Sequence, residues 1–397
     1  MTLTPAMAQY YEMKEQYSDC ILFFRMWDFY EMFDNDAHIA NKILWIAITT
    51  RNKNADTPTP LAWIPYHAKE KYLPLLVEAW YKVAFAEQIS DPKLKWIVKR
   101  EVVRVVTPST INLEWENYES HDASNYIISI VEKDWLYWIS LLDFSTNKWS
   151  TWEFNSFESL KSELYKISPK EVILEKKLFS NNEIKEVLEK KYSLNIYYFE
   201  AKGQANKKLL NHFSVKSLEW YGISDKKLSQ SASAMLLEYI ESNQKSELNF
   251  LNSISYISFD SYMNLDESTI RNLDLVYNFS TKSSNIWTLF WVLNKTKTPM
   301  WSSFLKEQIL KPLNNIDEIQ NRLNFIEEFI SNKILLDKIR NELSYVSNIN
   351  SILNRLALNR ATPRDLLNLK KSLQSILIIF EIIKLEGSKK LKQIINK

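Results

Sequence analysis

The sequence predicts a multidomain protein of mixed α/β and α class, with two α/β domains followed by an all-α region. Its 397 residues are too many for one ordinary hydrophobic core. Strand-like runs alternate with helical patterns up to about residue 243. From Leu265 onward apolar residues recur at helical spacing almost throughout, as at Ile319, Leu323 and Ile326.

The first predicted domain covers residues 1–112. Thr4 and Pro5 are residues typical of an N-cap and a first helical position, which predicts a helix over residues 5–17. A turn is expected at Trp27 and Asp28. The remaining pattern predicts strands at 20–26, 46–50, 81–87 and 98–106, and helices at 30–44 and 67–79.

The second predicted domain covers residues 124–245, after a polar and acidic linker at 112–124. Three strand-like runs at 126–132, 136–144 and 149–154 are spaced like an antiparallel meander. Helices at 156–166 and 181–191 and strands at 171–175 and 195–199 are then expected to alternate, with further helices up to about residue 243. The third region, residues 250–397, is predicted to be helical, and Thr298 with Pro299 opens one of its helices.

Composition excludes several classes of protein. The longest apolar runs are far shorter than the roughly 20 residues that a membrane span needs, and the N-terminus lacks the layout of a secretory signal. The single cysteine, Cys20, is typical of a reducing compartment. The expected location is therefore the cytoplasm, without a membrane partner. The net charge of +2 is too small to indicate nucleic-acid binding by itself.

Motifs for catalysis and cofactor binding are absent from the sequence. It contains no phosphate-binding loop, no dinucleotide fingerprint and no serine-nucleophile elbow. The four histidines and Cys20 do not have metal-ligand spacing. We therefore expect neither a catalyst nor a bound cofactor or metal in this chain.

Glycine and tryptophan are used abnormally. Average usage of about 7% would give about 28 glycines in this length, but the chain has 3 glycines and 14 tryptophans. Tryptophans also occur where turns are expected, as at Trp149 in the segment 146–149. Glycine is the residue that tight turns favour, so the tryptophans occupy positions that suit the opposite kind of side chain.

The run from Phe23 to Phe33 resembles the mismatch-binding signature of the MutS family, F-[FY]-R-M-G-D-F-Y-E-[ML]-F. Further runs that resemble the same family follow in the same order, at residues 61–68, 78–84, 98–108, 265–273 and 295–302. The resemblance covers the whole chain.

The resemblance implies a domain architecture and partners. Residues 1–112 correspond to the mismatch-binding domain, 124–245 to an RNase H-like connector domain, and 250–397 to the start of the helical core and lever. The clamp and the ATPase domain are expected beyond Lys397, so ATP and Mg²⁺ would bind outside this chain. The connector implies a MutL-like partner. The family dimerises largely through its ATPase domain, so this segment is expected to be monomeric.

The same resemblance implies the site. Phe29 corresponds to the wedge that stacks beside a mispaired or looped base at the minor groove of duplex DNA, and Glu31 to the side chain that hydrogen-bonds this base. Asp28 and Tyr30 are expected to set the turn and pack. From the residues alone, Phe29 is instead a core aromatic and Glu31 a solvated helix residue. Three basic residues are candidate contacts to the DNA backbone: Lys99, Arg100 and Arg104.

Tryptophan replaces glycine of the family pattern at six positions: Trp27, Trp63, Trp80, Trp96, Trp287 and Trp301. Random substitution would not convert glycine to tryptophan alone while leaving the neighbours intact. Our hypothesis is that the source reads the UGA codon as glycine, and that the sequence was translated with tryptophan instead.

Two other interpretations remain open. Asp143, at the end of a predicted strand, resembles the first metal-binding carboxylate of RNase H-like nucleases, although a two-metal nuclease needs further convergent carboxylates. Alternatively, the chain is a partner-interaction fragment that acts through its connector.

Overall fold

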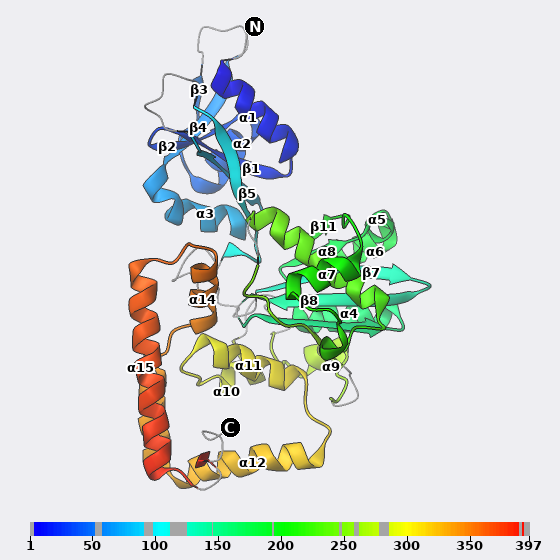
Figure 1. Ribbon diagram of the computed structural model, residues 1–397, viewed down its shortest axis with the longest axis vertical. Coiled ribbons are helices and arrows are strands. Elements are labelled where there is room, and N and C mark those ends of the chain that lie inside the picture. Colours follow the sequence, from blue (N-terminus) through cyan, green and yellow to red (C-terminus); the bar gives the residue numbers. More distant parts are fainter. Residues whose placement is uncertain are drawn as a thin grey trace. The chain divides into compact units, whose positions relative to one another are not determined.

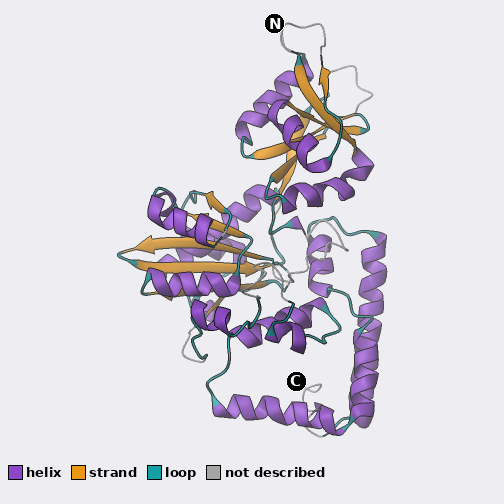
Figure 2. Cartoon of the chain, turned by 180° about the vertical axis from the view of Figure 1, so that it is seen from behind, coloured by secondary structure: helices purple, strands orange, loops and turns teal. Residues whose placement is uncertain are grey.

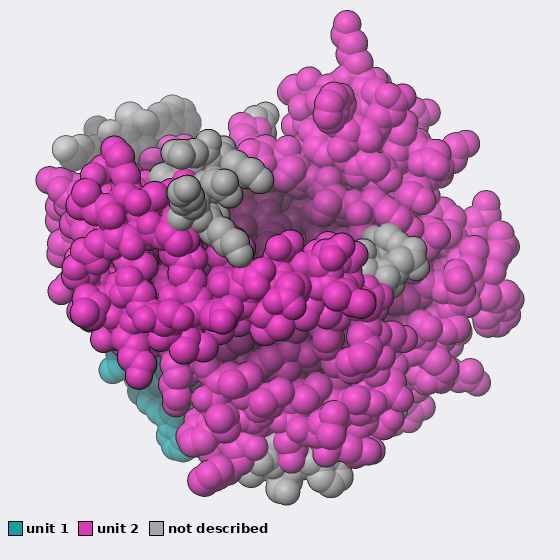
Figure 3. Space-filling model, turned by 90° about the horizontal axis from the view of Figure 1, so that it is seen from below, with its two compact units in different colours: residues 1–118, 237–248 teal, residues 119–236, 249–397 magenta. Residues whose placement is uncertain are grey.

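The computed structural model describes residues 4–51, 58–90, 98–111, 125–144, 146–192, 194–245, 248–257, 262–277, 286–388 and 391–392. It divides into two compact units, drawn in teal and magenta in Figure 3. The first contains residues 1–118 and 237–248, and the second contains residues 119–236 and 249–397. The second unit thus holds the helical region and most of the second predicted domain, whose residues 237–245 belong to the first unit. The predicted linker at 112–124 lies outside the described residues.

The first unit is built on a six-stranded sheet of order β3-β4-β2-β1-β5-β6, visible near the N-terminal end in Figures 1 and 2. Its strands pair antiparallel except for β1 and β5, which are parallel. The elements are α1 (Pro5–Gln16), β1 (Cys20–Met26), β2 (Phe29–Phe33), α2 (Asp34–Leu44), β3 (Thr49–Arg51), β4 (Thr59–Pro65), η1 (Tyr66–Ala68), α3 (Lys69–Glu78), β5 (Lys82–Gln88) and β6 (Arg100–Val106).

Both faces of this sheet are covered, because alternate side chains of β1 enter different cores. Ile21 and Phe23 pack in a cluster with residues of α2 and α3, whereas Leu22 and Phe24 pack in a cluster with Met7 and other residues of α1. The continuous apolar run in β1 is therefore that of a central strand buried on both faces.

Most predicted elements of the first unit are confirmed, but three details were wrong. The expected helix 30–44 begins only at Asp34, because Phe29–Phe33 forms β2. The strand expected at 46–50 is β3, Thr49–Arg51, and strand β4, Thr59–Pro65, was missed. Pro60 and Pro65, near the two ends of β4, weakened the strand pattern of this segment.

The second unit contains a sheet of order β11-β10-β7-β8-β9-β12. The predicted meander is confirmed as the antiparallel strands β7 to β9, and β10 and β11 extend the sheet in parallel with β7. The elements are β7 (Tyr126–Lys133), β8 (Leu136–Asp143), β9 (Lys148–Phe154), α4 (Phe157–Ile167), β10 (Glu171–Leu174), α5 (Lys176–Phe179), α6 (Asn182–Glu186), a π-helical turn η3 (Val187–Lys191), β11 (Ile196–Tyr198), α7 (Ala205–Phe213), η4 (Glu219–Tyr221), α8 (Lys227–Gln244) and β12 (Ser255–Tyr256). Of α8, residues 237–244 belong to the first unit.

The helical prediction is confirmed for the described residues from Leu265 onward, whereas residues 255–256 of the same predicted region form the strand β12. The helices from Leu265 onward are α9 (Glu267–Asn272), α10 (Leu289–Leu293), α11 (Pro299–Leu310), α12 (Ile316–Ser331), α13 (Lys333–Leu343), α14 (Ile349–Ala357) and α15 (Pro363–Glu386). Thr298 caps α11 through its side chain, as its place before Pro299 predicted. Within the residues that the structure describes, no helix has the length and apolar character needed to cross a membrane.

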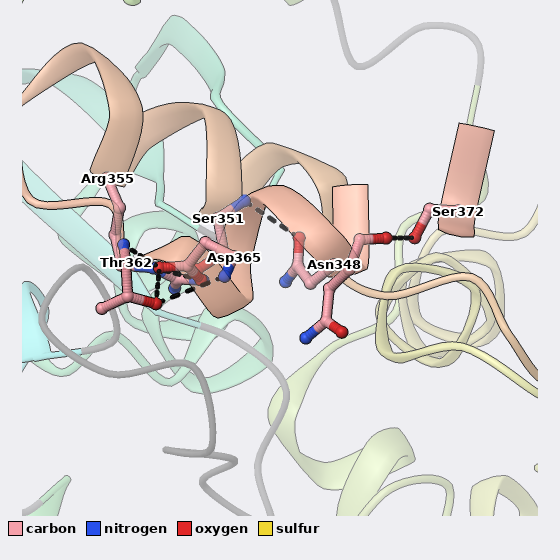
Figure 4. Close-up of polar contacts among 7 residues, drawn as sticks. Asn348, Ser351, Arg355, Thr362, Asp365 and Ser372 are labelled. Atoms are coloured by element: carbon pink, nitrogen blue, oxygen red, sulfur yellow. Dashed lines mark hydrogen bonds and ion pairs between the residues drawn. The ribbon is translucent and has the colours of Figure 1, made fainter. Parts of the chain in front are cut away.

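A buried polar cluster joins α14 to α15 (Figure 4). Arg355 of α14 forms an ion pair with Asp365 in the first turn of α15, and both residues are buried. Asp365 also accepts a hydrogen bond from the backbone N–H of Thr362 at 2.8 Å, which completes a capping box. Because removing either member of a buried ion pair leaves an uncompensated charge, this cluster fixes how α15 starts.

The interpretation of Trp149 as a turn residue was wrong. Trp149 lies inside β9, is buried, and donates a hydrogen bond from Nε1 to Ser140 Oγ at 2.7 Å. The turn itself includes Asn147, which has a positive φ of 59°. Asparagine tolerates this left-handed conformation better than most residues do.

Trp45 offers a direct test of left-handed strain. It caps the C-terminal end of α2 with φ 56° and ψ 34°, and its side chain is 91% exposed, so little packing compensates the strain. We expect Trp45→Gly to raise the free energy of unfolding of the first unit by about 0.5–1 kcal/mol, because the relief of strain exceeds the entropy that glycine adds to the unfolded chain. Urea unfolding measures the change.

The matched control is Trp220→Gly. Trp220 is 98% exposed but lies in η4 and is not among the residues with positive φ. The same exchange there is expected to leave stability unchanged or to lower it. Equal effects at both positions would contradict the explanation by backbone strain.

Candidate nucleic-acid interface

The hairpin between β1 and β2 places Phe29 and Glu31 on one face of the sheet. Met26 pairs with Phe29, so only Trp27 and Asp28 form the turn. Because side chains alternate along a strand, Phe29, Glu31 and Phe33 share a face, whereas Tyr30 points into the opposite core and is buried.

Exposure rises along this face towards the turn. Phe33 is buried against the ring of Tyr10, with ring centroids 4.7 Å apart. Glu31 is half-buried, and Phe29 is 37% exposed. The Phe29 ring packs edge-on against Trp63 of β4 at a centroid distance of 4.7 Å. The partly exposed ring of Phe29 thus lies at the turn end of this face, and the Glu31 carboxyl follows two residues farther from the turn.

Glu31 has a basic partner that the sequence did not indicate. Arg51 of β3 forms an ion pair with it, with Nη1 3.1 Å from Oε2. Burial raises the pKa of the Glu31 carboxyl above its ordinary value, and the charges of Arg51 and then Arg100 act in the opposite direction. The two residues meet because β4 pairs with both β2 and β3. Only recognition of β4 could have predicted the contact.

Three residues are candidates for contacts to the DNA backbone, and they differ in exposure: Lys99, directly before β6, and Arg100 and Arg104 within it. Lys99 is exposed and pairs with Glu101, with Nζ 2.5 Å from Oε1. Arg104 is half-buried, with its guanidinium 4.6 Å from the centroid of the Phe85 ring. Arg100 is buried, and its guanidinium donates to the carbonyl oxygens of Arg25 and Val98 at 2.6 and 3.0 Å.

Arg100 therefore differs from a surface contact. Burial lowers the pKa of its guanidinium, and the charge of Glu31 opposes this shift. Of the three residues, Lys99 has the most open position for a phosphate, although it lies on the approach to β6, which is not adjacent to β2 in the sheet.

The six tryptophans at glycine positions of the family pattern fall into three groups. Trp27, Trp80 and Trp287 have positive φ angles of 53°, 68° and 67°. Trp63 lies in β4 and Trp301 in α11, both without positive φ. Trp96 lies outside the described residues. Two further tryptophans, Trp45 and Trp135, also have positive φ.

Asp143, the candidate nuclease residue, is buried at the end of β8 and accepts a hydrogen bond from Thr146 Oγ1 at 2.7 Å. Among the residues that the structure describes, no three His, Cys, Asp or Glu side chains are arranged to hold a metal ion. Basic residues, including Lys148 and Lys166, line the small cavity beside Asp143. This environment does not favour the nuclease interpretation.

Three family models match the chain in sequence order. MutS domain I matches residues 4–114, MutS domain II matches residues 125–252, and MutS domain III matches residues 268–397. The chain belongs to the MutS family. The resemblance found in the run from Phe23 to Phe33 is thereby confirmed.

Curated MutS relatives agree with this assignment. A protein named DNA mismatch repair protein MutS from Lachnoclostridium phytofermentans is 37% identical over 99% of this chain and 42% of its own length. Proteins of the same name from Methanococcoides burtonii and Caldanaerobacter subterraneus are 38% and 36% identical over 96% and 100% of this chain. The chain spans 43% and 46% of their respective lengths, which is less than half of each MutS relative.

The Glu31–Arg51 pair gives a prediction about protonation. Arg51→Met removes the charge that most strongly opposes the effect of burial, so the pKa of Glu31 is expected to rise further above its ordinary value. Glu31 then takes up its proton at a higher pH than in the parent chain. Carbon-detected NMR titration of the Glu31 carboxyl measures the shift.

Lys99→Met is the control for this titration, because it also removes one positive charge but from a residue paired with Glu101. It should leave the Glu31 titration unchanged. An unshifted Glu31 in Arg51→Met would show that the ion pair does not persist in solution.

Proposed function

We propose that this chain recognises mispaired or looped duplex DNA, with Phe29 as a wedge at the minor groove and Glu31 as the hydrogen-bonding partner of the displaced base. The observation that carries the proposal is the shared, partly exposed face of Phe29 and Glu31 at the β1–β2 turn. The relatives' printed name, DNA mismatch repair protein MutS, supports the same substrate.

The physical basis of this recognition is the deformability of DNA. An apolar ring that enters a base step must unstack it, and unstacking costs least where pairing is already broken. Stacking on the ring returns roughly 1–3 kcal/mol per base. Phe29 can therefore select for a local defect without reading a base sequence.

Glu31 adds a second selection. A carboxylate near phosphates is repelled, and its ion pair with Arg51 reduces this repulsion by neutralising the charge. A displaced base supplies the hydrogen-bond partner that an intact duplex withholds. Burial raises the pKa of the Glu31 carboxyl above its ordinary value, and in its protonated form a carboxyl can donate a hydrogen bond as well as accept one.

The second sheet supports an RNase H-like connector, which we propose for residues 124–245. Its meander β7–β8–β9, followed by β10 and β11 in parallel with β7, has the strand arrangement expected of that class. We further propose the connector as the surface for a MutL-like partner. In this proposal residues 250–397 form the first part of the core and lever, and the chain by itself is monomeric.

In this proposal no residue of the chain binds ATP, Mg²⁺ or another cofactor. Nucleotide binding and the homodimer of the whole family belong to its ATPase domain. Lys99 and Arg104 contribute contacts to the DNA backbone, which position the protein without specifying sequence.

Phe29→Ala tests the wedge. We expect the affinity for a duplex with one mismatch to fall to that for the matched duplex, while the salt-dependent background binding persists. Fluorescence anisotropy with both duplexes measures the two affinities. Phe304→Ala, which removes a similarly exposed ring from α11 (41% exposed), should preserve the preference. A retained mismatch preference in Phe29→Ala would refute the wedge.

We also propose that the native protein has glycine at Trp27, Trp63, Trp80, Trp96, Trp287 and Trp301, through a UGA codon read as glycine. The positive φ of Trp27, Trp80 and Trp287 supports the proposal, because left-handed backbone favours glycine. At position 63, glycine would also remove the indole that packs on Phe29 and uncover more of the Phe29 ring for stacking on a base.

Peptide mass spectrometry of the native protein across residues 25–36 tests this proposal. We expect a peptide with the mass of glycine at position 27. A peptide that carries Trp27 would refute the proposal that UGA is read as glycine. It would not affect the roles proposed for Phe29 and Glu31.

A further inference from the structure

Three carbonyl oxygens around the β1–β2 turn accept hydrogen bonds from groups outside the turn. Arg100 Nε donates to the oxygen of Arg25 at 2.6 Å, and Arg25 Nε donates to the oxygen of Trp27 at 2.5 Å. The backbone N–H of Tyr66 donates to the oxygen of Asp28 at 2.9 Å. The segment that leads into Phe29 is therefore fixed along its length rather than only at its strand ends.

The side chain of Tyr66 reinforces one of these bonds. The Arg25 guanidinium carbon lies 3.8 Å from the centroid of the Tyr66 ring, which is a close cation–π contact. Tyr66 begins η1 immediately after β4, where Pro65 pairs with Phe29. The ring is thus held at a fixed place relative to the wedge, and it in turn holds the guanidinium that bonds to Trp27.

The Arg25–Tyr66 contact lies behind the wedge rather than beside it. Arg25 pairs with Tyr30, and the Arg25 guanidinium also lies 5.6 Å from the centroid of the buried Tyr30 ring. Because Tyr30 and Phe29 point to opposite faces of β2, Arg25 acts from the face opposite Phe29. It supports the turn without occupying the surface where a base would stack.

We propose that Tyr66 is a positioning residue for mismatch recognition: its ring holds the Arg25 guanidinium against the Trp27 carbonyl, and the turn fixed in this way holds Phe29 as a wedge. Arg100, which is buried, is the second support of the same turn through the carbonyl of Arg25. The inference rests on the proposed function, because it assigns Tyr66 a role in the presentation of Phe29.

The expected consequence is selective. If the turn is free to move, the Phe29 ring samples several orientations in the unbound protein. Ordering the ring on binding then costs free energy, which reduces the affinity for mismatched DNA. Background binding through backbone contacts does not need the ring and should be unaffected. Loss of the Tyr66 ring should therefore lower the ratio of mismatched to matched affinity and leave the matched affinity as it was.

The test compares Tyr66→Leu and Tyr66→Phe in the 397-residue chain. Both variants keep the backbone N–H that bonds to Asp28, but only Tyr66→Phe keeps a ring under Arg25. We expect Tyr66→Leu to reduce the mismatch preference by about two- to five-fold, in line with an exposed cation–π contact, and Tyr66→Phe to retain it. Anisotropy with both duplexes at two salt concentrations measures preference and background together.

Two further measurements separate positioning from a general loss of structure. Tyr198→Leu removes an equally exposed tyrosine (43% against 40%) from the second sheet and should leave the preference intact. The NMR resonance of the Arg25 Nε–H reports the ring directly. It should lose its ring-current shift in Tyr66→Leu and keep it in Tyr66→Phe, without any DNA present.

The outcomes are distinguishable. A lost Arg25 shift together with a lower preference in Tyr66→Leu supports the inference. A lost shift with an unchanged preference overturns it, as does an Arg25 resonance that does not respond to Tyr66→Leu. If the parent chain itself has no mismatch preference, the proposed function fails, and the positioning role assigned to Tyr66 fails with it, whatever the Arg25 resonance shows.

Discussion

The two-residue turn at Trp27 and Asp28 is the constraint on which the candidate site depends. Because Met26 pairs with Phe29, the register of β2 is set at its first residue, and alternation then assigns every later side chain to a face. A slip by one residue would bury Phe29 and expose Tyr30. The core residues Tyr30 and Met32 oppose such a slip, since both are fully buried. Core packing and presentation of Phe29 are thus one requirement.

The tryptophans show how much local strain an otherwise regular fold can carry at its surface. Trp27, Trp45 and Trp135 have left-handed backbone and largely exposed indoles. Because these indoles are exposed, the fold needs only the backbone conformation at these positions and not the side chain. Trp149, in contrast, is buried and hydrogen-bonded within β9. The 14 tryptophans therefore do not share one structural role: some are exposed at left-handed positions, whereas Trp149 is part of the core.

Sequence reasoning predicted the order of elements better than the details that build the site. The helix 30–44 was extended over β2 because Tyr30 and Phe33 continue the helical spacing of the buried Ala37, Ala40 and Leu44. Five residues of strand alternation are too few to outweigh that pattern. Phe29 and Glu31 were predicted from the family resemblance. Arg51 was not, because its contact with Glu31 depends on the pairing of β4, which local patterns missed.

Rigidity of the turn and discrimination by deformability belong together. A wedge that selects defects by the cost of unstacking must present the same ring geometry to matched and mismatched steps, or its own rearrangement would absorb the difference. The bonds to the carbonyls of Arg25, Trp27 and Asp28 supply that constancy. They come from β6, β1 and η1, which are far apart in sequence. Residues without a direct contact to DNA, including the buried Arg100, therefore contribute to the mismatch recognition that we propose.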